Sequence, residues 1–390
     1  MCARYLGVVA FLRLGSTRGV VALLVGAAAL VAAVAAATGA ALGGGGEAPP
    51  AAPLPQAIHD SLSGPKLDGV TARVKFTSNL FGGMTTEQSS ALLKGGSGRL
   101  WLAPDKLRVE LQSDNGDAQI VFDNGKGFVY DGPSNTAYTF AFADKADGGS
   151  HAGSGAPPTL AQIEQRIAKA EQHVAIEGPD PQVVAGQPAY EVRVTPKQPG
   201  GLIGAAQLAW DAARGVPLKI GVYARGADTP ALQLEATDIA YGAVDPSVFD
   251  LSVPAGAKTV DLGGGSGGHR PGEQSQNGGW SFTAEAPAAL GPRARRKLER
   301  NGDGYLVLYG KGLDTIAVFE HAAKAGDQPG AGTNADGGPL ELPTVDVGGT
   351  KATAFGTPLG GLVSFERAGI AYTVAGSQPL DVLEAAAAAL

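Results

Sequence analysis

The sequence contains almost no cysteine, since Cys2 is the only one among 390 residues. A single cysteine cannot form an intrachain disulfide, so any folded domain must be held together by its core. Lipoprotein processing needs a cysteine just after an apolar leader, whereas Cys2 lies before the apolar stretch near the N-terminus. The sequence therefore excludes both a disulfide scaffold and a lipid-modified cysteine.

Patterns that carry catalysis or bind metals are also missing. Neither H-x-x-x-H nor H-E-x-x-H spacing occurs among the five histidines, which are His59, His151, His173, His269 and His321. The glycine-rich run 264–268 matches G-x-S-x-G, but it has neither the strand before it nor the helix after it that a nucleophile elbow requires. The sequence therefore predicts a protein that is not an enzyme and has no metal and no cofactor.

Positive charge is scarce outside the N-terminal leader. The whole chain has a net charge of −7, and the leader has three arginines and no acid. The rest of the chain thus has 27 basic and 37 acidic residues, a net charge of −10. Nucleic-acid binding needs a basic surface, so this balance predicts no nucleic-acid partner.

One local exception is a run of basic residues within a helix that we expect at 287–300. The run is a candidate basic surface, and its members are Arg293, Arg295, Arg296, Lys297 and Arg300. It fits an ordinary solvated helix face, and it also fits contact with anionic lipid headgroups or with an acidic partner.

The longest uncharged stretch is Val20–Leu42, which follows Arg4, Arg13 and Arg18. About 20 apolar residues suffice to span a bilayer as a helix, and basic residues before the span keep residues 1–19 in the cytoplasm. The stretch is either a signal anchor or a signal peptide cleaved near the small residues 38–40. Both interpretations place the remaining chain outside the cytoplasm, either anchored to the plasma membrane by a single pass or secreted.

Glycine and proline mark the domain boundaries. Residues 43–54 are predicted to form a stalk, and residues 263–279 a polar linker. They leave two candidate domains, 55–262 and 280–390.

The first domain is rich in period-two alternation. In 70–77, for example, Val70, Val74 and Phe76 alternate with Thr71 and Lys75. Several such runs, separated by turn signals, predict a large antiparallel sheet with one apolar face.

A helical pattern interrupts these strands at 158–174, with Thr159 as its N-cap. Its apolar stripe consists of Leu160, Ile163 and Ile167. We expect this helix to be a lid on the apolar face of the sheet. In the second domain the patterns predict the helix at 287–300, six strands between 305 and 375, and a helix at 379–390, which together form a small α+β domain.

The stretch 210–256 carries three linked motifs. These are an Asp-x-x-x-Gly-x-Pro hairpin from Asp211, an Asp-Ile-x-Tyr-Gly strand end at Tyr241, and an Asp-Pro-x-x-Phe-x-Leu-x-x-Pro closure from Asp245. Together they resemble the end of a LolA-like domain, the superfamily of bacterial lipoprotein and lipid carriers that includes the RseB/MucB stress sensors. The segment 280–390 resembles the small domain that follows such domains in stress sensors.

This resemblance implies the fold class α+β, with an unclosed antiparallel β half-barrel wrapping helices, then a small α+β domain, behind one N-terminal transmembrane helix. It also implies a hydrophobic cavity between sheet and helices. The candidate lining residues are Phe76, Leu100, Phe122, Phe128, Tyr130, Tyr138, Phe140, Tyr190, Trp210 and Ile220. An ordinary filled core would give the same pattern.

The sequence thus leaves two functions open. One is a non-enzymatic extracytoplasmic protein that binds acyl chains of a lipid or acylated lipoprotein at the outer face of the plasma membrane. The other is an RseB/MucB-like envelope-stress module that regulates an anti-sigma factor or another membrane partner. Both functions have the plasma membrane, a lipid or a membrane regulator protein as expected partners.

Overall fold

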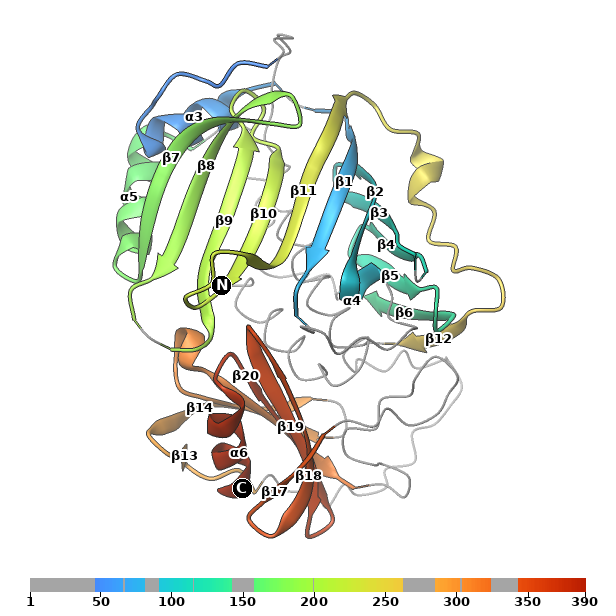
Figure 1. Cartoon of the computed structure of the whole chain (residues 1–390), viewed down its shortest axis with the longest axis vertical. Helices are drawn as coiled ribbons and strands as arrows, with labels where there is room; N and C mark the ends of the chain where they lie inside the picture. Colours follow the sequence, from blue (N-terminus) through green and yellow to red (C-terminus); the bar gives the residue numbers. More distant parts are fainter. Residues whose placement is uncertain are drawn as a thin grey trace. The chain divides into compact units, whose positions relative to one another are not determined.

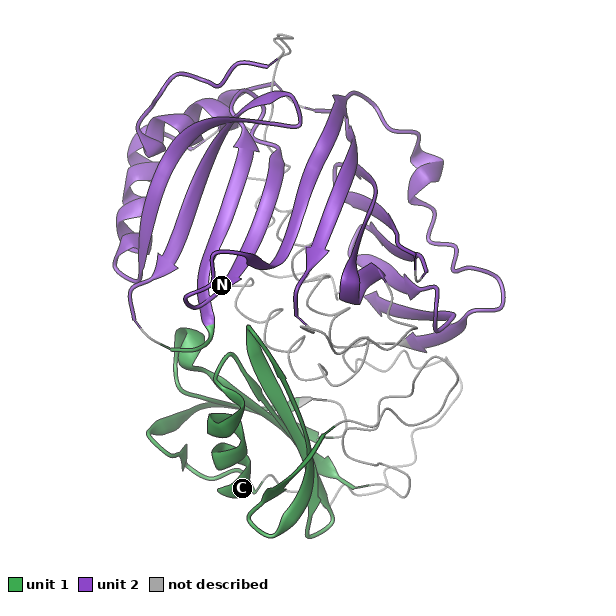
Figure 2. Cartoon of the chain, viewed as in Figure 1, with its two compact units in different colours: residues 1–23, 200–202, 261–390 green, residues 24–199, 203–260 purple. Residues whose placement is uncertain are grey.

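The computed structural model describes residues 46–65, 67–80, 91–114, 116–141, 158–198, 200–261, 285–301, 304–323 and 343–390 (Figure 1). These residues group into two compact units (Figure 2). The larger unit contains the described residues up to 198 and those of 203–260. The smaller unit contains residues 200–202 and the described residues from 261 to 390.

The larger unit is built on one antiparallel sheet of twelve strands in the order β12-β6-β5-β4-β3-β2-β1-β11-β10-β9-β8-β7. The sheet is open, since β12 and β7 are its two edges. Its strands are β1 Val70–Ser78, β2 Gly95–Ala103, β3 Lys106–Gln112, β4 Ala118–Asp123, β5 Lys126–Asp131, β6 Thr136–Ala141, β7 Val174–Val184, β8 Gln187–Pro196, β9 Ile203–Asp211, β10 Pro217–Ala224, β11 Pro230–Tyr241 and β12 Lys258–Asp261.

The expected alternation is confirmed in β1, where Val70, Val74 and Phe76 are buried while Thr71 and Lys75 are exposed. Residues paired directly across an antiparallel sheet point to the same face, so the register defines the apolar face of each strand. From β8 to β6 that face includes Tyr190, Trp210, Ile220, Leu234, Phe76, Leu100, Val109, Ile120, Val129 and Tyr138. We call it the inner face.

Three helices and one 3-10 turn accompany this sheet. They are α3 Leu54–Ser63, α4 Ala91–Lys94, α5 Leu160–Glu171 and the 3-10 turn η1 Pro246–Phe249. The predicted N-cap of α5 is confirmed: the Gln162 amide donates to the Thr159 hydroxyl, and the Gln162 side chain accepts from the Thr159 amide, forming a capping box. Helix α5 packs mainly against α3 and β7 (Figure 1).

The smaller unit has one antiparallel sheet of eight strands in the order β13-β14-β15-β16-β20-β19-β18-β17. Its elements are β13 Ala289–Leu290, β14 Arg293–Asn301, β15 Gly304–Tyr309, the 3-10 turn η2 Gly312–Asp314, β16 Ile316–Ala322, β17 Thr344–Val347, β18 Thr350–Thr357, β19 Gly360–Arg367, β20 Ile370–Gly376 and α6 Leu380–Ala388. The six strands predicted between 305 and 375 and the C-terminal helix are therefore confirmed.

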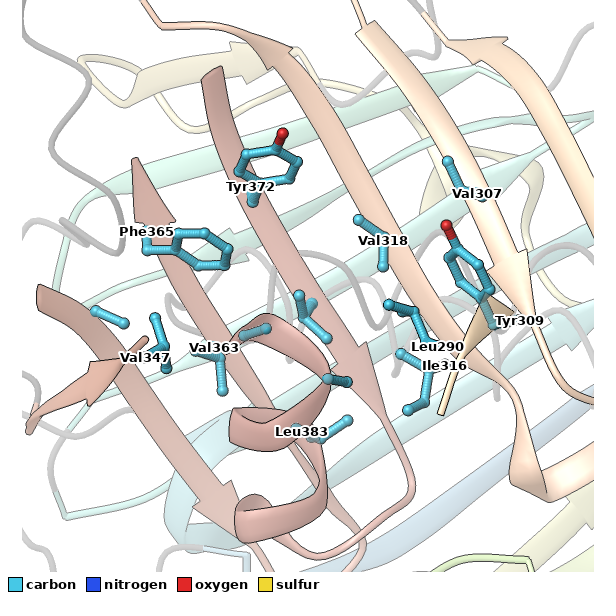
Figure 3. Close-up of a cluster of buried hydrophobic side chains, with 14 of the residues drawn as sticks. Leu290, Val307, Tyr309, Ile316, Val318, Val347, Val363, Phe365, Tyr372 and Leu383 are labelled. Carbon is cyan, nitrogen blue, oxygen red and sulfur yellow. The ribbon is translucent and has the colours of Figure 1, made fainter. Parts of the chain in front are cut away.

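The core of the smaller unit lies on one face of its sheet, where Leu383 of α6 packs among buried side chains of the central strands (Figure 3). Phe365 and Tyr372 stack with ring centroids 5.0 Å apart. This contact lies at one end of the core and joins neighbouring strands β19 and β20.

The helix predicted at 287–300 is wrong, because this segment forms β13, a tight turn and β14. Gly291 lies in the turn with a φ of +54°, and Pro292 follows it. Proline inside a helix removes a backbone donor and clashes with the preceding turn. Gly291 and Pro292 therefore prevent a continuous helix, and the chain reverses at this point. The basic residues of the run consequently lie on strand β14.

Several sequence-based expectations fall outside the described residues. They include the apolar leader 20–42, residues 43–45 of the stalk, the linker 263–279 and the glycine run within it. No helix in the described ranges is both long and apolar enough to cross a bilayer.

Candidate binding site

Helix α3 covers the inner face at the β8–β9 end of the large sheet. The Trp210 indole Nε1 donates to the Ser61 hydroxyl at 2.8 Å, and that hydroxyl donates to the Ala57 carbonyl at 2.6 Å. The Tyr190 hydroxyl donates to the Pro50 carbonyl at 2.7 Å, just before α3. Burial raises the pKa of Tyr190, with a smaller contribution from the charge of Asp60. The structure therefore assigns Tyr190 and Trp210 to the anchoring of α3.

A small hollow lies at the centre of the sheet, on strands β1, β2, β10 and β11 and the turn before β10. Its volume is about 30 Å³. The lining is almost wholly apolar and consists of Val70, Ala72, Val74, Leu100, Leu102, Val216, Pro217, Leu218, Lys219, Ile220, Leu234, Ala236 and Ile239. Of the ten predicted lining residues, the structure brings Leu100 and Ile220 together at this hollow.

Four of the residues around the hollow are less covered than the aromatic residues beneath α3. Leu100, Ile220, Leu234 and Ile239 are only partly buried, whereas Tyr190 and Trp210 beneath α3 are buried. The centre of the inner face therefore presents apolar side chains that remain partly accessible.

Four further predicted residues share the inner face but lie away from the hollow. Phe76 is buried on β1, and Phe122, Tyr138 and Phe140 lie on strands β4 and β6. The Phe140 ring lies over Gly127, where an added Cβ would approach it to 2.6 Å. Phe122, Tyr138 and Phe140 thus fill the β4–β6 end of the face, whereas Phe76 is buried separately on β1.

The remaining two predicted residues point to the opposite face. Phe128 pairs with Val121, and Tyr130 pairs with Gln119, whereas Phe122 pairs with Gly127. Residues of one strand alternate between faces, so Phe128 and Tyr130 cannot line a site on the inner face. Their inclusion in the predicted cavity is wrong.

The opposite face carries a cover that the sequence did not predict. Phe249 in η1 is fully buried, and η1 packs against β3 and β4. The Arg108 guanidinium donates to the Val248 carbonyl at 3.0 Å, and Lys106 lies 5.9 Å from the centre of the Phe249 ring. The Asp-Pro-x-x-Phe motif was the available signal, because Asp245 caps this turn and Phe249 supplies its buried side chain.

Helix α5 does not cover the hollow. Ile163 is buried, with 4% of its surface exposed, and Ile167 is partly buried. Leu160 is 36% exposed. Since α5 packs mainly against α3 and the edge strand β7, the predicted lid lies at one end of the inner face and not over its centre.

A buried ionic cluster stabilises the β9–β10 hairpin. Asp211 is fully buried and accepts from the amides of Ala213 at 2.8 Å and Arg214 at 2.9 Å, and from the Arg214 guanidinium at 3.2 Å. The Tyr241 hydroxyl donates to the same carboxylate at 2.5 Å, and Arg214 stacks on the Tyr241 ring at 4.3 Å. Burial raises the pKa of Tyr241, and its hydrogen bond to Asp211 adds to the rise. Two of the sequence motifs thus meet in a structural contact.

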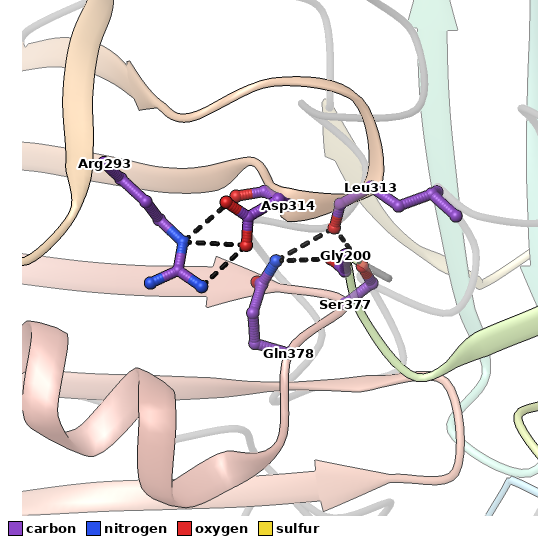
Figure 4. A network of polar contacts seen from close by, with 6 residues as sticks. All are labelled: Gly200, Arg293, Leu313, Asp314, Ser377 and Gln378. Carbon is purple, nitrogen blue, oxygen red and sulfur yellow. Dashed lines mark hydrogen bonds and ion pairs between the residues drawn. The ribbon is translucent and has the colours of Figure 1, made fainter. Parts of the chain in front are cut away.

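Part of the basic run in the smaller unit has structural partners. Arg293 donates to the Asp314 carboxylate through Nε at 3.0 Å and Nη2 at 2.6 Å, and so holds the turn η2 (Figure 4). The Arg295 guanidinium donates to the Ala286 carbonyl at 2.7 Å, and Lys297 pairs with Glu299. The remaining predicted members, Arg296 and Arg300, are exposed.

The same turn is held from a second side. The Gln378 amide donates to the carbonyls of Leu313 at 2.9 Å and Gly200 at 3.1 Å, and the Ser377 hydroxyl donates to the Leu313 carbonyl at 2.6 Å (Figure 4). This network of hydrogen bonds to backbone carbonyls stabilises the β15–β16 connection. In the described ranges, no three His, Cys, Asp or Glu side chains are placed to hold a metal ion.

No family model and no curated protein sequence matches this chain. Its fold is similar to that of solved structures at low identity. MucB in complex with the MucA periplasmic region is 16% identical, with a TM-score of 0.41, and the match covers 86% of this chain and 94% of that chain. The Pseudomonas aeruginosa MucA/MucB complex matches at 16% identity over 86% and 94% of the two chains, with a TM-score of 0.40.

A putative outer membrane lipoprotein-sorting protein domain from Vibrio parahaemolyticus is 12% identical over 47% of this chain and 89% of that chain, with a TM-score of 0.16. At these values the function has to be argued from the residues themselves.

Proposed function

We propose that this protein is a non-enzymatic extracytoplasmic binding protein for the acyl chains of a lipid or lipoprotein, which it holds at the centre of the inner face. The observation that supports this most is the hollow on β1, β2, β10 and β11, with its almost wholly apolar lining. In this proposal the open sheet acts as a LolA-like half-barrel, and α3 with α5 closes one end of it.

The driving force for binding would be burial of ligand hydrocarbon, at about 0.8 kcal/mol per methylene group. The hollow of about 30 Å³ is much smaller than the roughly 300–1,000 Å³ of ordinary ligand sites. An acyl chain therefore enters only when side chains that border the hollow move apart. Leu100, Ile220 and Leu234 are the first to do so in this proposal, because they are only partly buried.

The experiment compares two charge insertions on the same sheet. Ile220→Asp places a carboxylate at the hollow, whereas Thr71→Asp places one on the exposed opposite face of β1. Lipid that co-purifies with each protein is measured by native mass spectrometry, and binding of a fluorescent fatty acid is measured by titration. We expect Ile220→Asp to lose both signals and Thr71→Asp to keep both.

A thermal melt of each variant separates lost binding from lost folding. Should the folded Ile220→Asp variant retain lipid like the parent, the hollow is not the binding site. A parent protein that carries no lipid from expression and binds no acyl probe contradicts the function itself.

We also propose that both units lie outside the cytoplasm, on the strength of the apolar leader and its preceding arginines. A reporter that is active only outside the cytoplasm is fused after Leu390. Its activity is the expected result. A stable but inactive fusion contradicts the proposed compartment and, with it, every envelope function considered for this chain.

A second candidate is an envelope-stress module that contacts a membrane regulator, in the manner of RseB/MucB-like sensors. It is favoured by the presence of a second unit with a core of its own, which acyl-chain binding at the inner face does not use. Deletion of residues 285–390 should then abolish the regulatory output while leaving lipid binding intact. Equal loss of both contradicts a separate role for the smaller unit.

A further inference from the structure

A short irregular segment, residues 285–288, precedes β13 and packs on the core of the smaller unit. Ala286 is buried as part of that core. The Tyr309 hydroxyl donates to the Pro287 carbonyl at 2.9 Å, and the Arg295 guanidinium donates to the Ala286 carbonyl at 2.7 Å. We call residues 285–288 the strap, because these contacts hold it across the sheet although it belongs to neither a helix nor a strand.

The strap lies against a buried carboxyl group. Glu320 on β16 is fully buried, and among the described residues neither of its carboxyl oxygens has a hydrogen-bond partner of ordinary geometry. The amides of Glu285 and Ala286 in the strap face this carboxyl. Water can therefore reach Glu320 only when something around it opens, and the strap is the neighbour that can move without breaking the sheet.

The titratable and charged groups that face Glu320 come from four elements. They are Glu285 of the strap, Arg295 of β14, Tyr305 and Tyr309 of β15, and Tyr372 of β20. Burial is the main reason that the pKa of Glu320 is raised, and the charge of Glu285 adds to the rise, whereas Arg295 opposes it. Ionisation of Glu320 thus places a second carboxylate beside Glu285 in a site closed to water.

We propose that ionisation of Glu320 releases the strap, so that residues 285–288 are a pH-sensitive segment at the start of the smaller unit. While the carboxyl is neutral it stays buried and the strap stays closed. Once ionised, the carboxylate needs water, and the strap moves aside while the sheet remains folded. This device goes beyond acyl-chain binding and does not depend on it.

The sign and size of the effect follow from proton linkage. In the open form Glu320 meets water, and its pKa returns to the ordinary value of 4.5. The closed form holds the proton to a higher pH. The equilibrium constant for opening therefore rises by about tenfold per pH unit from 4.5 to the pKa of the closed form, and then levels off.

The test is native-state hydrogen exchange of the full chain in a mild detergent, at several pH values and at several low urea concentrations. Peptides that contain residues 285–290 report on the strap, and peptides from β19 and β20 report on the sheet. After correction for the intrinsic exchange rate at each pH, we expect the strap to exchange faster than the sheet. Its exchange should not depend on urea, because a local opening exposes little surface.

Two variants and a matched control assign the effect. Glu320→Gln keeps the shape of the side chain and should remove the pH dependence of exchange in the strap. Tyr309→Phe removes the hydroxyl that holds Pro287 and should increase opening by about fivefold at every pH, with the pH dependence kept. Glu366→Gln, at an exposed position on β19, should change neither. A thermal melt checks that each variant is folded.

Any of three results overturns the proposal. In the first, exchange of the strap does not change with pH, so the strap does not respond to Glu320. In the second, the strap and the sheet exchange at the same rate and with the same dependence on urea, so the strap has no opening of its own. In the third, Glu320→Gln keeps the pH dependence of the parent, which assigns it to another group.

Discussion

Glu320 on β16 is an acidic residue within the core of the smaller unit. Its side chain is fully buried, on the same face as the core residues Ile316 and Val318. Neither carboxyl oxygen has a hydrogen-bond partner of ordinary geometry among the described residues. We predict that Glu320→Gln, which keeps the shape and removes the charge, stabilises the smaller unit at neutral and basic pH.

Burial is the main reason that the pKa of Glu320 is raised from its ordinary value of 4.5. The charge of Glu285 adds to the rise, while Arg295 and the amides of Ala286 and Glu285 oppose it. From β15 and β20, Tyr309 and Tyr372 face the same region, and burial raises the pKa of Tyr309 to about 12 and that of Tyr372 as well. The two phenols therefore stay neutral while Glu320 titrates.

The sign follows from proton linkage. The folded state holds the Glu320 proton to a higher pH than the unfolded state does, so the stability of the smaller unit falls as pH rises from 4.5 through the folded pKa. An unpartnered buried polar group costs about 1–3 kcal/mol, and a charged one costs more. We expect Glu320→Gln to recover about 1–3 kcal/mol at about pH 8 and almost nothing near pH 4.5.

The assay is calorimetry of the full chain at several pH values, together with hydrogen exchange of peptides from β15 to β20. Each kcal/mol should raise Tm of this unit by roughly 3–6 °C. Glu366→Gln, at an exposed position on β19, is the matched control and should change neither the stability nor its pH dependence. Two results would refute the reasoning. One is that the stability of the unmodified protein rises between about pH 5 and pH 8. The other is that Glu320→Gln is destabilised equally at these two pH values.

Three further substitutions test contacts in the larger unit. Ser61→Ala leaves the buried Trp210 indole without its acceptor and should destabilise this unit by about 1–3 kcal/mol, which urea unfolding followed by tryptophan fluorescence measures; an unchanged midpoint contradicts the anchoring of α3. Asp211→Asn removes the charge that a buried guanidinium shares and should cost about 3–5 kcal/mol, read in the same assay, and a loss below 1 kcal/mol argues against the cluster. Ile163→Asp should release α5 from its packing, since this side chain is buried and an uncompensated charge there costs several kcal/mol. Leu160→Asp, at an exposed position of the same helix, should be nearly neutral. Limited proteolysis within α5 distinguishes the two variants, and equal cutting of both contradicts the packing of α5.

The sequence alone predicted most strands, most of their inner-face residues and the C-terminal helix. The strands were predictable because alternation with a period of two is typical of a half-buried strand. The prediction failed for Phe128 and Tyr130, because hydrophobic character alone does not show which face of the sheet a residue occupies. The tight turn at Asn124 and Gly125 places Lys126 opposite Asp123 and Gly127 opposite Phe122. This register sends Phe128 to the other side of the sheet, a result that depends on strand pairing and not on hydrophobicity.

What only the tertiary structure decided is where distant segments meet. Ser61 and Trp210 are 149 residues apart and share a hydrogen bond, and Phe249 covers a sheet face that looks solvated in each strand taken singly. Helices α3 and α5 pack with each other and with the edge strand β7, whereas the hollow lies on the central strands of the same sheet. Local sequence patterns determine which element forms and which face is apolar, whereas packing between remote elements determines which part of that face remains uncovered.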